Sequence, residues 1–297
     1  MKYTKVALEI PALILRLQAK GLVVPDAAHA ERVLRSIGYF RFRGYGLALM
    51  QPAPAAFAHG TRIFNPGVTF DQVYDLYLFD RALRCLIMDQ IDRIEVAART
   101  AIIYELNRLF GPHWYIDFSR NIFKKTDDQA KWFGDVSRDV HKSKEKFIQH
   151  YFSKYTAPIL PPSWAIAECL SFGKWSLLYK ELTHGKSAIA TTFALSPPVF
   201  ESWLHTLTHL RNACAHHSRL WDRLFPFPPK SHPRHPAHFS NAALLYPRLA
   251  AIRIMTNAID GNNALRDGLL SLFSMYAGVS PVQMGFPIAW STDPLWR

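Results

Sequence analysis

Cysteine is scarce in this sequence of 297 residues, which contains only Cys85, Cys169 and Cys214. The three lie far apart, and none forms the CxxC pair that is typical of zinc and redox sites. An odd, small number of cysteines is also unlike the disulfide framework of a small secreted domain. Each cysteine falls in an apolar helical pattern, so we expect buried free thiols in a reducing cytoplasm.

Long hydrophobic runs are missing as well. No apolar stretch is long enough to span a bilayer. The N-terminal apolar run is interrupted by Glu9, Pro11 and Arg16, and it lacks the continuous apolar segment and the small-residue cleavage site of a signal peptide. We therefore expect a cytoplasmic protein without a membrane segment.

Other local signals are also absent. The 14 glycines form no phosphate-binding loop, and no serine stands in a nucleophile elbow. No stretch of any length alternates apolar and polar residues as a strand does. Hydrophobic residues nevertheless make up 49% of the chain, which is enough to build a substantial core. These features predict an all-α protein.

Acidic residues are outnumbered by basic ones, with 23 Asp and Glu against 35 Lys and Arg. The formal net charge is therefore +12. A surplus of this size favours a polyanionic partner. A basic protein with no such partner is the simpler alternative.

Apolar residues recur at helical spacing through most of the chain. The longest such pattern runs without Gly or Pro between Thr69, which can cap a helix, and Gly111, which can end one. Residues 51–68 are rich in Pro, Ala and Gly and predict a loop. This loop suggests an N-terminal helical module at 1–60 and a helical domain at 61–297, although the two could form one continuous domain.

Two stretches concentrate basic residues. Between 32 and 45, arginines alternate with aromatic residues, and cations beside flat rings suit a nucleic-acid strand through phosphate pairing and base stacking. The rings could equally belong to a core, with the arginines as its solvated rim. Residues 127–154, preceded by Lys124-Lys125, form a charged helical pattern that predicts one outer helix adding to a basic face.

Charged residues in the long helix have two interpretations. Arg81 and Arg84 are three apart and share a face that could meet phosphate. Glu95 and Arg99 are four apart and can pair with each other. Structural pairing is the commoner explanation for such residues.

The residues best suited to acid–base chemistry crowd one predicted helix, which carries the run WLHTLTHLRNACAHH and begins near Ser196. An apolar stripe at helical spacing consists of Trp203, Leu207, Leu210 and Cys214. At 100° per residue, the opposite side carries His205, His209, Asn212 and His216. Arg211 lies at the edge between the two sides.

This set of side chains has a chemistry. A histidine can give or take a proton near neutral pH, and an arginine is a fixed cation whose planar fork suits phosphate. Cleavage of an RNA phosphodiester by its own 2′-hydroxyl needs such a proton shuttle and such a clamp. The alternative is a helix that carries ordinary surface histidines, since short patterns of this kind recur by chance.

The wider sequence favours the first interpretation. Arg-Asn-x-x-x-His at 211–216, followed by His-Ser-Arg-Leu-Trp, resembles the signature of the HEPN superfamily (higher eukaryotes and prokaryotes nucleotide-binding). Within it, the chain resembles the Abi family of bacterial abortive-infection proteins, of the AbiD/AbiF type. The resemblance spans about residues 30 to 225 and includes Gly38-Tyr39-Phe40-Arg41, Phe79-Asp80-Arg81, Ile94-Glu95 and Pro161-Pro162-Ser163-Trp164.

The resemblance implies a HEPN-like helical bundle with an added N-terminal helical module. It implies an endoribonuclease of phage-defence or toxin–antitoxin type, with catalytic roles for Arg211, Asn212 and His216 and with no metal or cofactor. RNA is the implied substrate, and the family also permits a small regulatory RNA as partner. Because the superfamily has non-catalytic members, a scaffold that binds RNA or protein without cutting is the alternative. We assign RNA binding to basic residues in several segments, namely Arg41, Arg43, Arg81, Arg84, Arg99, His217 and Arg219.

Two points of geometry bear on this assignment. His205 and His209 are four apart, as two helical zinc ligands would be, but the run lacks the Glu of an HExxH helix and a third ligand with suitable spacing.

Arg211 and His216 are five apart, so a regular helix points them about 140° away from each other. The helix could loosen, the arginine could reach around, or a second copy could supply the missing partner. The resemblance implies the last, and hence a homodimer.

Overall fold

The computed structural model describes residues 6–54 and 61–297. Within these ranges the regular secondary structure is mostly α-helical, and the only strands are two of three residues each. The prediction of an all-α protein is therefore confirmed. Among the described helices, none combines the length with the hydrophobicity that crossing a membrane requires.

The chain divides into two compact units. The first comprises Met1–Leu83 with Leu269–Pro281, and the second comprises Arg84–Gly268 with Val282–Arg297. Two helices, α4 (Phe70–Phe110) and α12 (Ala264–Met275), contribute residues to both units. The candidate catalytic residues all belong to the second unit.

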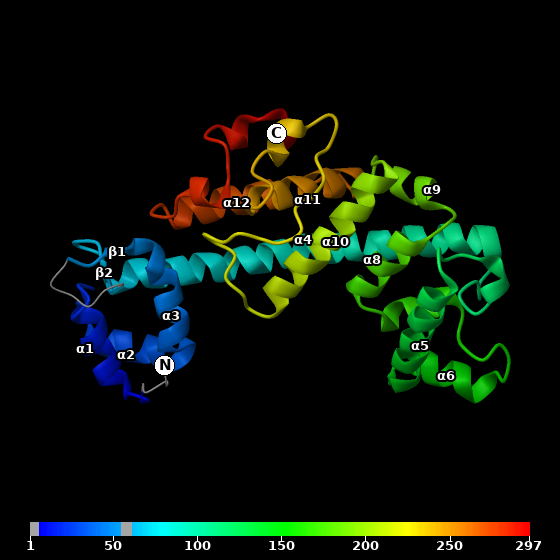
Figure 1. The fold of residues 1–297 in the computed structure, drawn as a ribbon, viewed down its shortest axis with the longest axis horizontal. Helices are drawn as coiled ribbons and strands as arrows, with labels where there is room; N and C mark the ends of the chain where they lie inside the picture. The colour runs from blue at the N-terminus through cyan, green and yellow to red at the C-terminus, as the bar shows by residue number, and fades with distance from the viewer. Residues whose placement is uncertain (1–5, 55–60) are drawn as a thin grey trace. The chain divides into compact units, whose positions relative to one another are not determined.

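Three short helices precede α4 in the first unit (Figure 1), namely α1 (Ile10–Gln18), α2 (Ala27–Ile37) and α3 (Tyr39–Gly46). Its core contains an aromatic stack of Phe42 on Phe70, with ring centroids 4.3 Å apart. The Tyr45 hydroxyl donates to the carboxylate of the fully buried Asp80 at 2.7 Å. A buried carboxylate needs such a donor, because leaving it unpaired would cost several kcal/mol.

The segment predicted as a loop contains a small hairpin. Strand β1 (Met50–Pro52) pairs antiparallel with β2 (Arg62–Phe64), and Met50 lies opposite Phe64. Both residues are buried. Strands of three residues are too short to show an alternating pattern, which is why the hairpin was not predicted.

The longest predicted helix is confirmed in α4, at both of its ends. Thr69 and Gln72 form a reciprocal capping box: the Gln72 N–H donates to Thr69 Oγ1 at 3.2 Å, and the Thr69 N–H donates to Gln72 Oε1 at 3.0 Å. The helix stops before Gly111, whose φ of 82° leaves the helical region. Isoleucines and leucines along one side of α4 are fully buried, so the helix is held by packing over its whole length.

The second unit holds the remaining helices, which are α5 (Thr126–Lys142), α6 (Lys146–Lys154), α7 (Ser163–Ile166), α8 (Phe172–Glu181), α9 (Lys186–Thr191), α10 (Pro197–Ala215) and α11 (Tyr246–Ile259). Helix α10 packs against α8, α9 and α11, and this places it within the bundle (Figure 1). Because it is surrounded on several sides, only part of its circumference can carry polar side chains.

Two local predictions were wrong. The charged pattern at 127–154 forms two helices, because the chain is extended at Ser143 and Glu145. Of the three cysteines, only Cys214 is buried, whereas Cys85 is exposed and Cys169 is half-buried. Cys85 lies two residues after the buried Leu83, and two residues of helix turn the side chain about 200° away from the core.

Candidate active site

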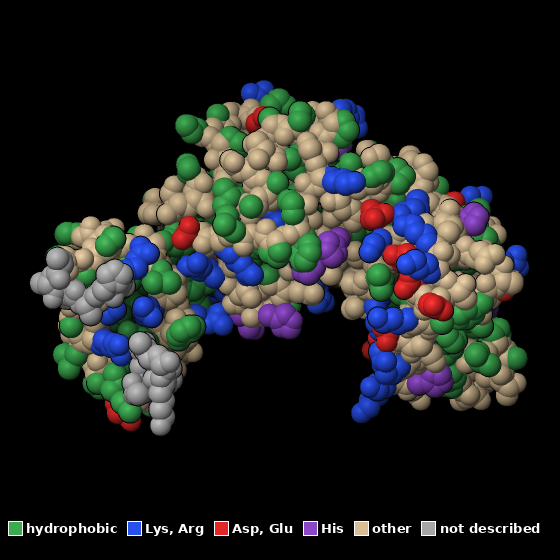
Figure 2. Space-filling view, in the orientation of Figure 1, with side chains coloured by type: hydrophobic (Ala, Val, Ile, Leu, Met, Phe, Trp, Pro, Cys, Tyr) green, Lys and Arg blue, Asp and Glu red, His purple; other side chains and the backbone are tan. Residues whose placement is uncertain are grey.

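The two faces of α10 agree with the helical periodicity. The inward side chains are at most 4% exposed, and they are Trp203, Leu207, Leu210 and Cys214. The opposite side chains are exposed, and they are His205, His209, Asn212 and His216. Figure 2 shows histidines along the lower half of α10 and at its end. The helix therefore presents a row of imidazoles and one carboxamide to solvent.

The helix ends inside the Arg-x4-His motif. His216 is the C-cap, and its N–H still donates to the Asn212 carbonyl at 2.9 Å. His217 follows with a φ of 55°, and the Ser218 N–H reaches back to the Ala213 carbonyl at 2.9 Å. This is a Schellman ending, in which a residue other than Gly at the left-handed position costs roughly 1 kcal/mol. His216 is thereby held at the last turn of α10, with its side chain exposed.

Arg211 faces α4. Its Nε lies 3.8 Å from Glu95 Oε2, and its side chain is 36% exposed against 14% for Glu95. Burial raises the pKa of Glu95 above its usual range, although the nearby charges of Arg211 and Arg99 act in the opposite direction. The distance makes this a loose ion pair. Arg211 therefore keeps part of its guanidinium accessible while its charge partly offsets that of Glu95.

The three motif residues do not meet within one chain. Among the described residues, no hydrogen bond or ion pair joins the Arg211 side chain to Asn212 or His216, and Arg211 pairs instead with Glu95. Asn212 and His216 share the exposed side of α10, as their spacing predicts. The angular separation of Arg211 and His216 expected from the sequence thus persists in the structure.

A match to a known protein family identifies the family of this chain. The family model described as Abi-like protein matches residues 32–222, which is more than half of the chain. The chain belongs to the Abi-like family. No curated protein and no solved structure gives a significant match. The matched segment begins in α2 and ends just beyond α10, so it includes the whole Arg-x4-His motif.

Two arginines on α4 of this Abi-like protein have structural partners. Arg84 is only 5% exposed, and its Nη1 donates to the Ser218 carbonyl at 3.3 Å, directly behind the motif. Arg99 bonds Glu168 at 3.0 Å through its Nη2, in place of the predicted pair with Glu95. Both arginines therefore tie α4 to neighbouring segments, and Arg84 helps to fix the end of α10.

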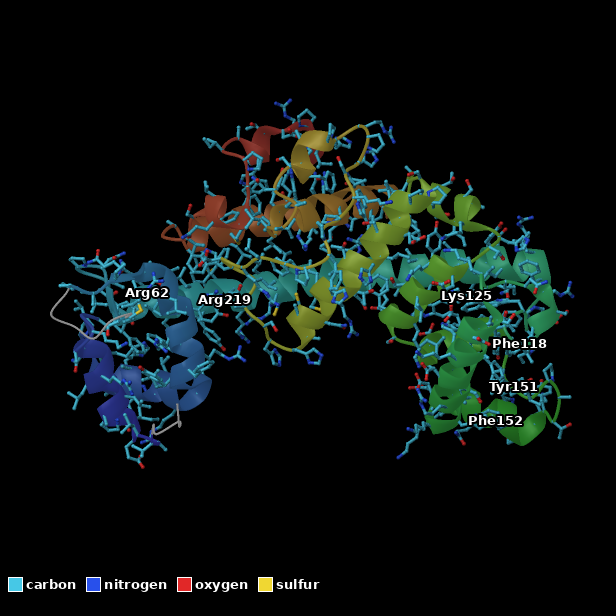
Figure 3. All side chains as sticks on the ribbon, in the orientation of Figure 1. Arg62, Phe118, Lys125, Tyr151, Phe152 and Arg219 are labelled. Atoms are coloured by element: carbon cyan, nitrogen blue, oxygen red, sulfur yellow. The ribbon has the colours of Figure 1, made fainter. Side chains whose placement is uncertain are left out.

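The other arginines assigned to RNA binding differ in exposure. Arg219 follows α10, is half-buried, and donates through Nη2 to the Asp222 carbonyl at 3.1 Å (Figure 3). Arg81 and Arg41 are exposed in the first unit. Arg43 is half-buried, and its Nε is buried without a hydrogen-bond partner among the described residues.

The arginines and aromatic residues between 32 and 45 fit both interpretations of this stretch, since some rings lie in a core and others are exposed. Phe42 and Tyr45 are fully buried and belong to the core of the first unit. Phe40, by contrast, is 86% exposed, beside the exposed Arg41. The part of this stretch that could stack on a base is therefore limited to its start.

The sequence did not single out Phe227, which completes a cluster on α10. Its ring stacks on His209 at a centroid distance of 4.2 Å and meets His205 edge-on at 4.7 Å. Burial, and then the charge of His205, lower the pKa of His209 below its usual range. Within the ranges that the structure describes, no three His, Cys, Asp or Glu residues are placed to hold a metal ion.

Proposed function

We propose that this Abi-like protein is an endoribonuclease that acts in abortive infection and cleaves RNA without a metal ion. The family supports a role in phage defence. The observation that carries the chemistry is that Asn212 and His216 are exposed on one side of the end of α10, while the Arg211 side chain beside them is 36% exposed. The HEPN resemblance of the motif supplies the reaction class.

The proposed reaction is an internal transesterification. His216 removes the proton from the ribose 2′-hydroxyl, and the 2′-oxygen attacks the adjacent phosphorus. Arg211 stabilises the extra negative charge on the phosphate oxygens, and Asn212 orients His216 or a phosphate oxygen. The bond from phosphorus to the 5′-oxygen breaks, and that oxygen takes up a proton. The products are a 2′,3′-cyclic phosphate and a 5′-hydroxyl.

The separation of Arg211 from His216 supports a site shared between two chains. A two-fold axis near the end of α10 would place each His216 beside the other chain's motif, and two half-sites would form one cleft. We therefore propose that the active form is a homodimer. Asn212 and His216, exposed at the end of α10, offer a polar surface for such a pairing.

The direct test uses purified protein and a mixture of RNAs. Cleavage should proceed in the presence of a chelator, and end-group analysis should find cyclic phosphates. His216→Ala should abolish cleavage while RNA binding survives. Activity that is lost to a chelator and restored by a divalent ion would contradict the proposed mechanism.

A second candidate is a binding protein that does not cut RNA. The contact of Arg211 with Glu95 favours it, because an arginine that partly offsets the charge of a half-buried carboxylate has a structural role within a single chain. Basic residues along the chain would then hold a structured or regulatory RNA. Intact RNA that co-purifies with the wild-type protein and resists prolonged incubation would support this candidate over the nuclease.

A further inference from the structure

Phe227 is held in a conformation that it would not adopt alone. Its φ of 57° lies in the left-handed region, which costs a residue with a side chain roughly 1–2 kcal/mol. Two donors fix its carbonyl: Thr206 Oγ1 at 3.1 Å and Arg248 Nη2 at 3.2 Å. Arg248 is only 1% exposed and also donates to the Pro226 carbonyl at 3.0 Å. The loop is therefore anchored to both α10 and α11.

This anchoring leaves an aromatic ring at the surface. Phe227 is 45% exposed although it stacks on His209 and meets His205. Both histidines are themselves exposed on α10. An exposed ring that is fixed from behind is a preorganised stacking surface, because little side-chain entropy remains to be lost when a flat ligand lands on it. The three rings therefore form a platform, which we call the His–Phe platform.

A groove adjoins the platform. It has a volume of about 470 Å³ and lies between α8 and α10, with His205 and His209 in its wall. Lys180 and Lys230 line it too, together with apolar groups such as Leu177. A cavity of this size, with a few polar groups among apolar ones, is in the range of small-molecule sites.

The charge of the groove favours an anion. Lys180 and Lys230 are exposed, and Lys180 has only a loose pair with Glu181 at 3.8 Å, whereas the acidic residue in the lining, Glu201, is paired with Lys186 at 2.6 Å. The backbone of Lys230 is fixed on both sides, since its N–H donates to Ser202 Oγ at 2.9 Å and its carbonyl accepts from Trp203 Nε1 at 2.8 Å. At least one lysine is thus presented to the groove from a rigid position.

We propose that this groove binds one nucleotide of a single-stranded RNA, with the base on the His–Phe platform and the phosphate beside Lys180 and Lys230. A flat ring next to a phosphate matches a stacking surface next to two cations. The choice of RNA over another polyanion rests on the proposed function. The stack itself does not require cleavage, so the groove is a binding subsite and not a part of the reacting centre.

The position of the groove suits a strand that reaches the motif. His209 and His216 are seven residues apart, which is about 10 Å along the axis of α10, and both are exposed. A strand anchored at the platform therefore needs to extend only a short way to bring a neighbouring phosphate to His216. The groove would fix which nucleotides lie at the motif.

Further lysines continue the basic surface at the other end of the groove. A second groove of about 330 Å³ shares Leu177 and Lys180 with the first, and its lining adds Lys124, Lys125 and Lys131 along with the acidic Asp128, Asp135 and Glu181. Figure 2 shows Lys and Arg side chains over α5 and α8 with some Asp and Glu side chains among them, and Figure 3 labels Lys125 in this region. A strand that leaves the platform would therefore stay close to positive charge.

The test measures binding without cleavage. In a His216→Ala background, Phe227→Leu should weaken the affinity for a short fluorescein-labelled single-stranded RNA by roughly 5- to 150-fold, the loss expected for one stacked base. Tyr104→Leu is the matched control, since Tyr104 is a 73% exposed aromatic residue on α4 outside both grooves, and it should leave the affinity unchanged. Lys230→Gln should reduce the slope of log affinity against log salt.

A second variant protects the test against misfolding. If Phe227→Leu unfolds the loop, His209→Gln removes the other half of the stack from an exposed helical position, and it should weaken binding in the same direction. Binding that is unaffected by both variants, or a parent protein that binds no RNA, would overturn the groove. A wild-type protein that cuts no RNA but depends on Phe227 for binding would refute the nuclease and leave the groove intact.

Discussion

The exposed face of α10 carries two sites. The side chains of one are already in contact within a single chain, and those of the other are not. The Arg-x4-His motif at its end has the residues for a reaction, yet Arg211 contacts Glu95, and no hydrogen bond or ion pair among the described residues joins it to His216. The His–Phe platform in the middle has no recognisable motif, yet its three rings are already in contact. The motif therefore indicates a reaction although its residues are not joined within one chain. The platform, by contrast, is formed by the packing of a loop, and no sequence motif indicates it.

The largest effect that separates the two sites should come from His216. His216→Ala should lower the cleavage rate by about 100-fold or more, the usual contribution of a positioned acid–base group. His209→Gln should change mainly the RNA concentration needed for half-maximal rate, because it removes binding and no proton transfer. Single-turnover cleavage across a range of protein concentrations measures both quantities. Equal losses of maximal rate in the two variants would erase the distinction.

Subunit mixing tests whether a second chain completes the motif. Arg211→Ala and His216→Ala should each be inactive alone. In a mixed dimer with a shared site, the intact His216 of one chain meets the intact Arg211 of the other, so one of two sites should recover. Light scattering at assay concentration should show a dimer. A fully active monomer would contradict the shared site, and a dimer with no recovery would mean that the cleft needs all four groups.

Arg248 holds the loop of the platform, so replacing it should lower the stability of the protein. Its guanidinium donates to carbonyls of both Pro226 and Leu244, and burial lowers its pKa to about 10, so it remains charged at neutral pH. Arg248→Met should lower the free energy of unfolding by about 3 kcal/mol, because several buried carbonyls lose their donor. Thermal melting measures this loss. Arg138→Met, at a surface pair with Asp135, should cost less than about 1 kcal/mol.

The sequence predicts those features of the two sites that depend on residues close together in the chain. It does not predict features that depend on contacts between residues far apart in the chain. The two faces of α10 and the ends of α4 follow from periodicity and capping, which involve residues a few positions apart. The pair of Arg211 with Glu95 joins two helices that are distant in sequence, so the local spacing favoured Arg99 instead. Phe227 reaches His209 because Thr206 and the distant Arg248 hold its loop from α10 and α11. The proposed reaction class rests on the resemblance of the motif to HEPN proteins, because residue spacing alone contains no such information.

The Arg211–Glu95 contact can be probed through pH. Because burial raises the pKa of Glu95, the folded state binds its proton more tightly than the unfolded chain, whose value is near 4.5. The resulting stability is present below that pH and is lost as the pH rises through the folded pKa. Glu95→Gln should therefore gain in Tm relative to the wild type as the pH rises from about 4 to 7.

Glu105 on the same helix provides a control of opposite sign. The hydrogen bond from Arg108 holds the pKa of Glu105 below its usual range. Its contribution to stability is therefore present above the unfolded pKa and is lost as the pH falls. Glu105→Gln should lose Tm at neutral pH and approach the wild type in acid. The same trend in both variants would mean that Arg211 and not burial governs Glu95.

The smallest expected effect concerns Arg41 and Arg43 in the first unit, and it asks whether RNA binding extends beyond α10. Replacing both with Gln should weaken RNA binding and flatten its salt dependence by about 0.7 in slope for each phosphate that is no longer neutralised, since fewer counterions are released. Arg41 is exposed and Arg43 is half-buried, so we expect the slope to change by an amount closer to one phosphate than to two. Titrations at several salt concentrations measure the slope, with Arg35→Gln as a control for an exposed arginine that already pairs with Glu31. An unchanged slope would assign these arginines to the rim of the core formed by Phe42 and Tyr45, and Arg81 would then be the remaining candidate for RNA binding in the first unit.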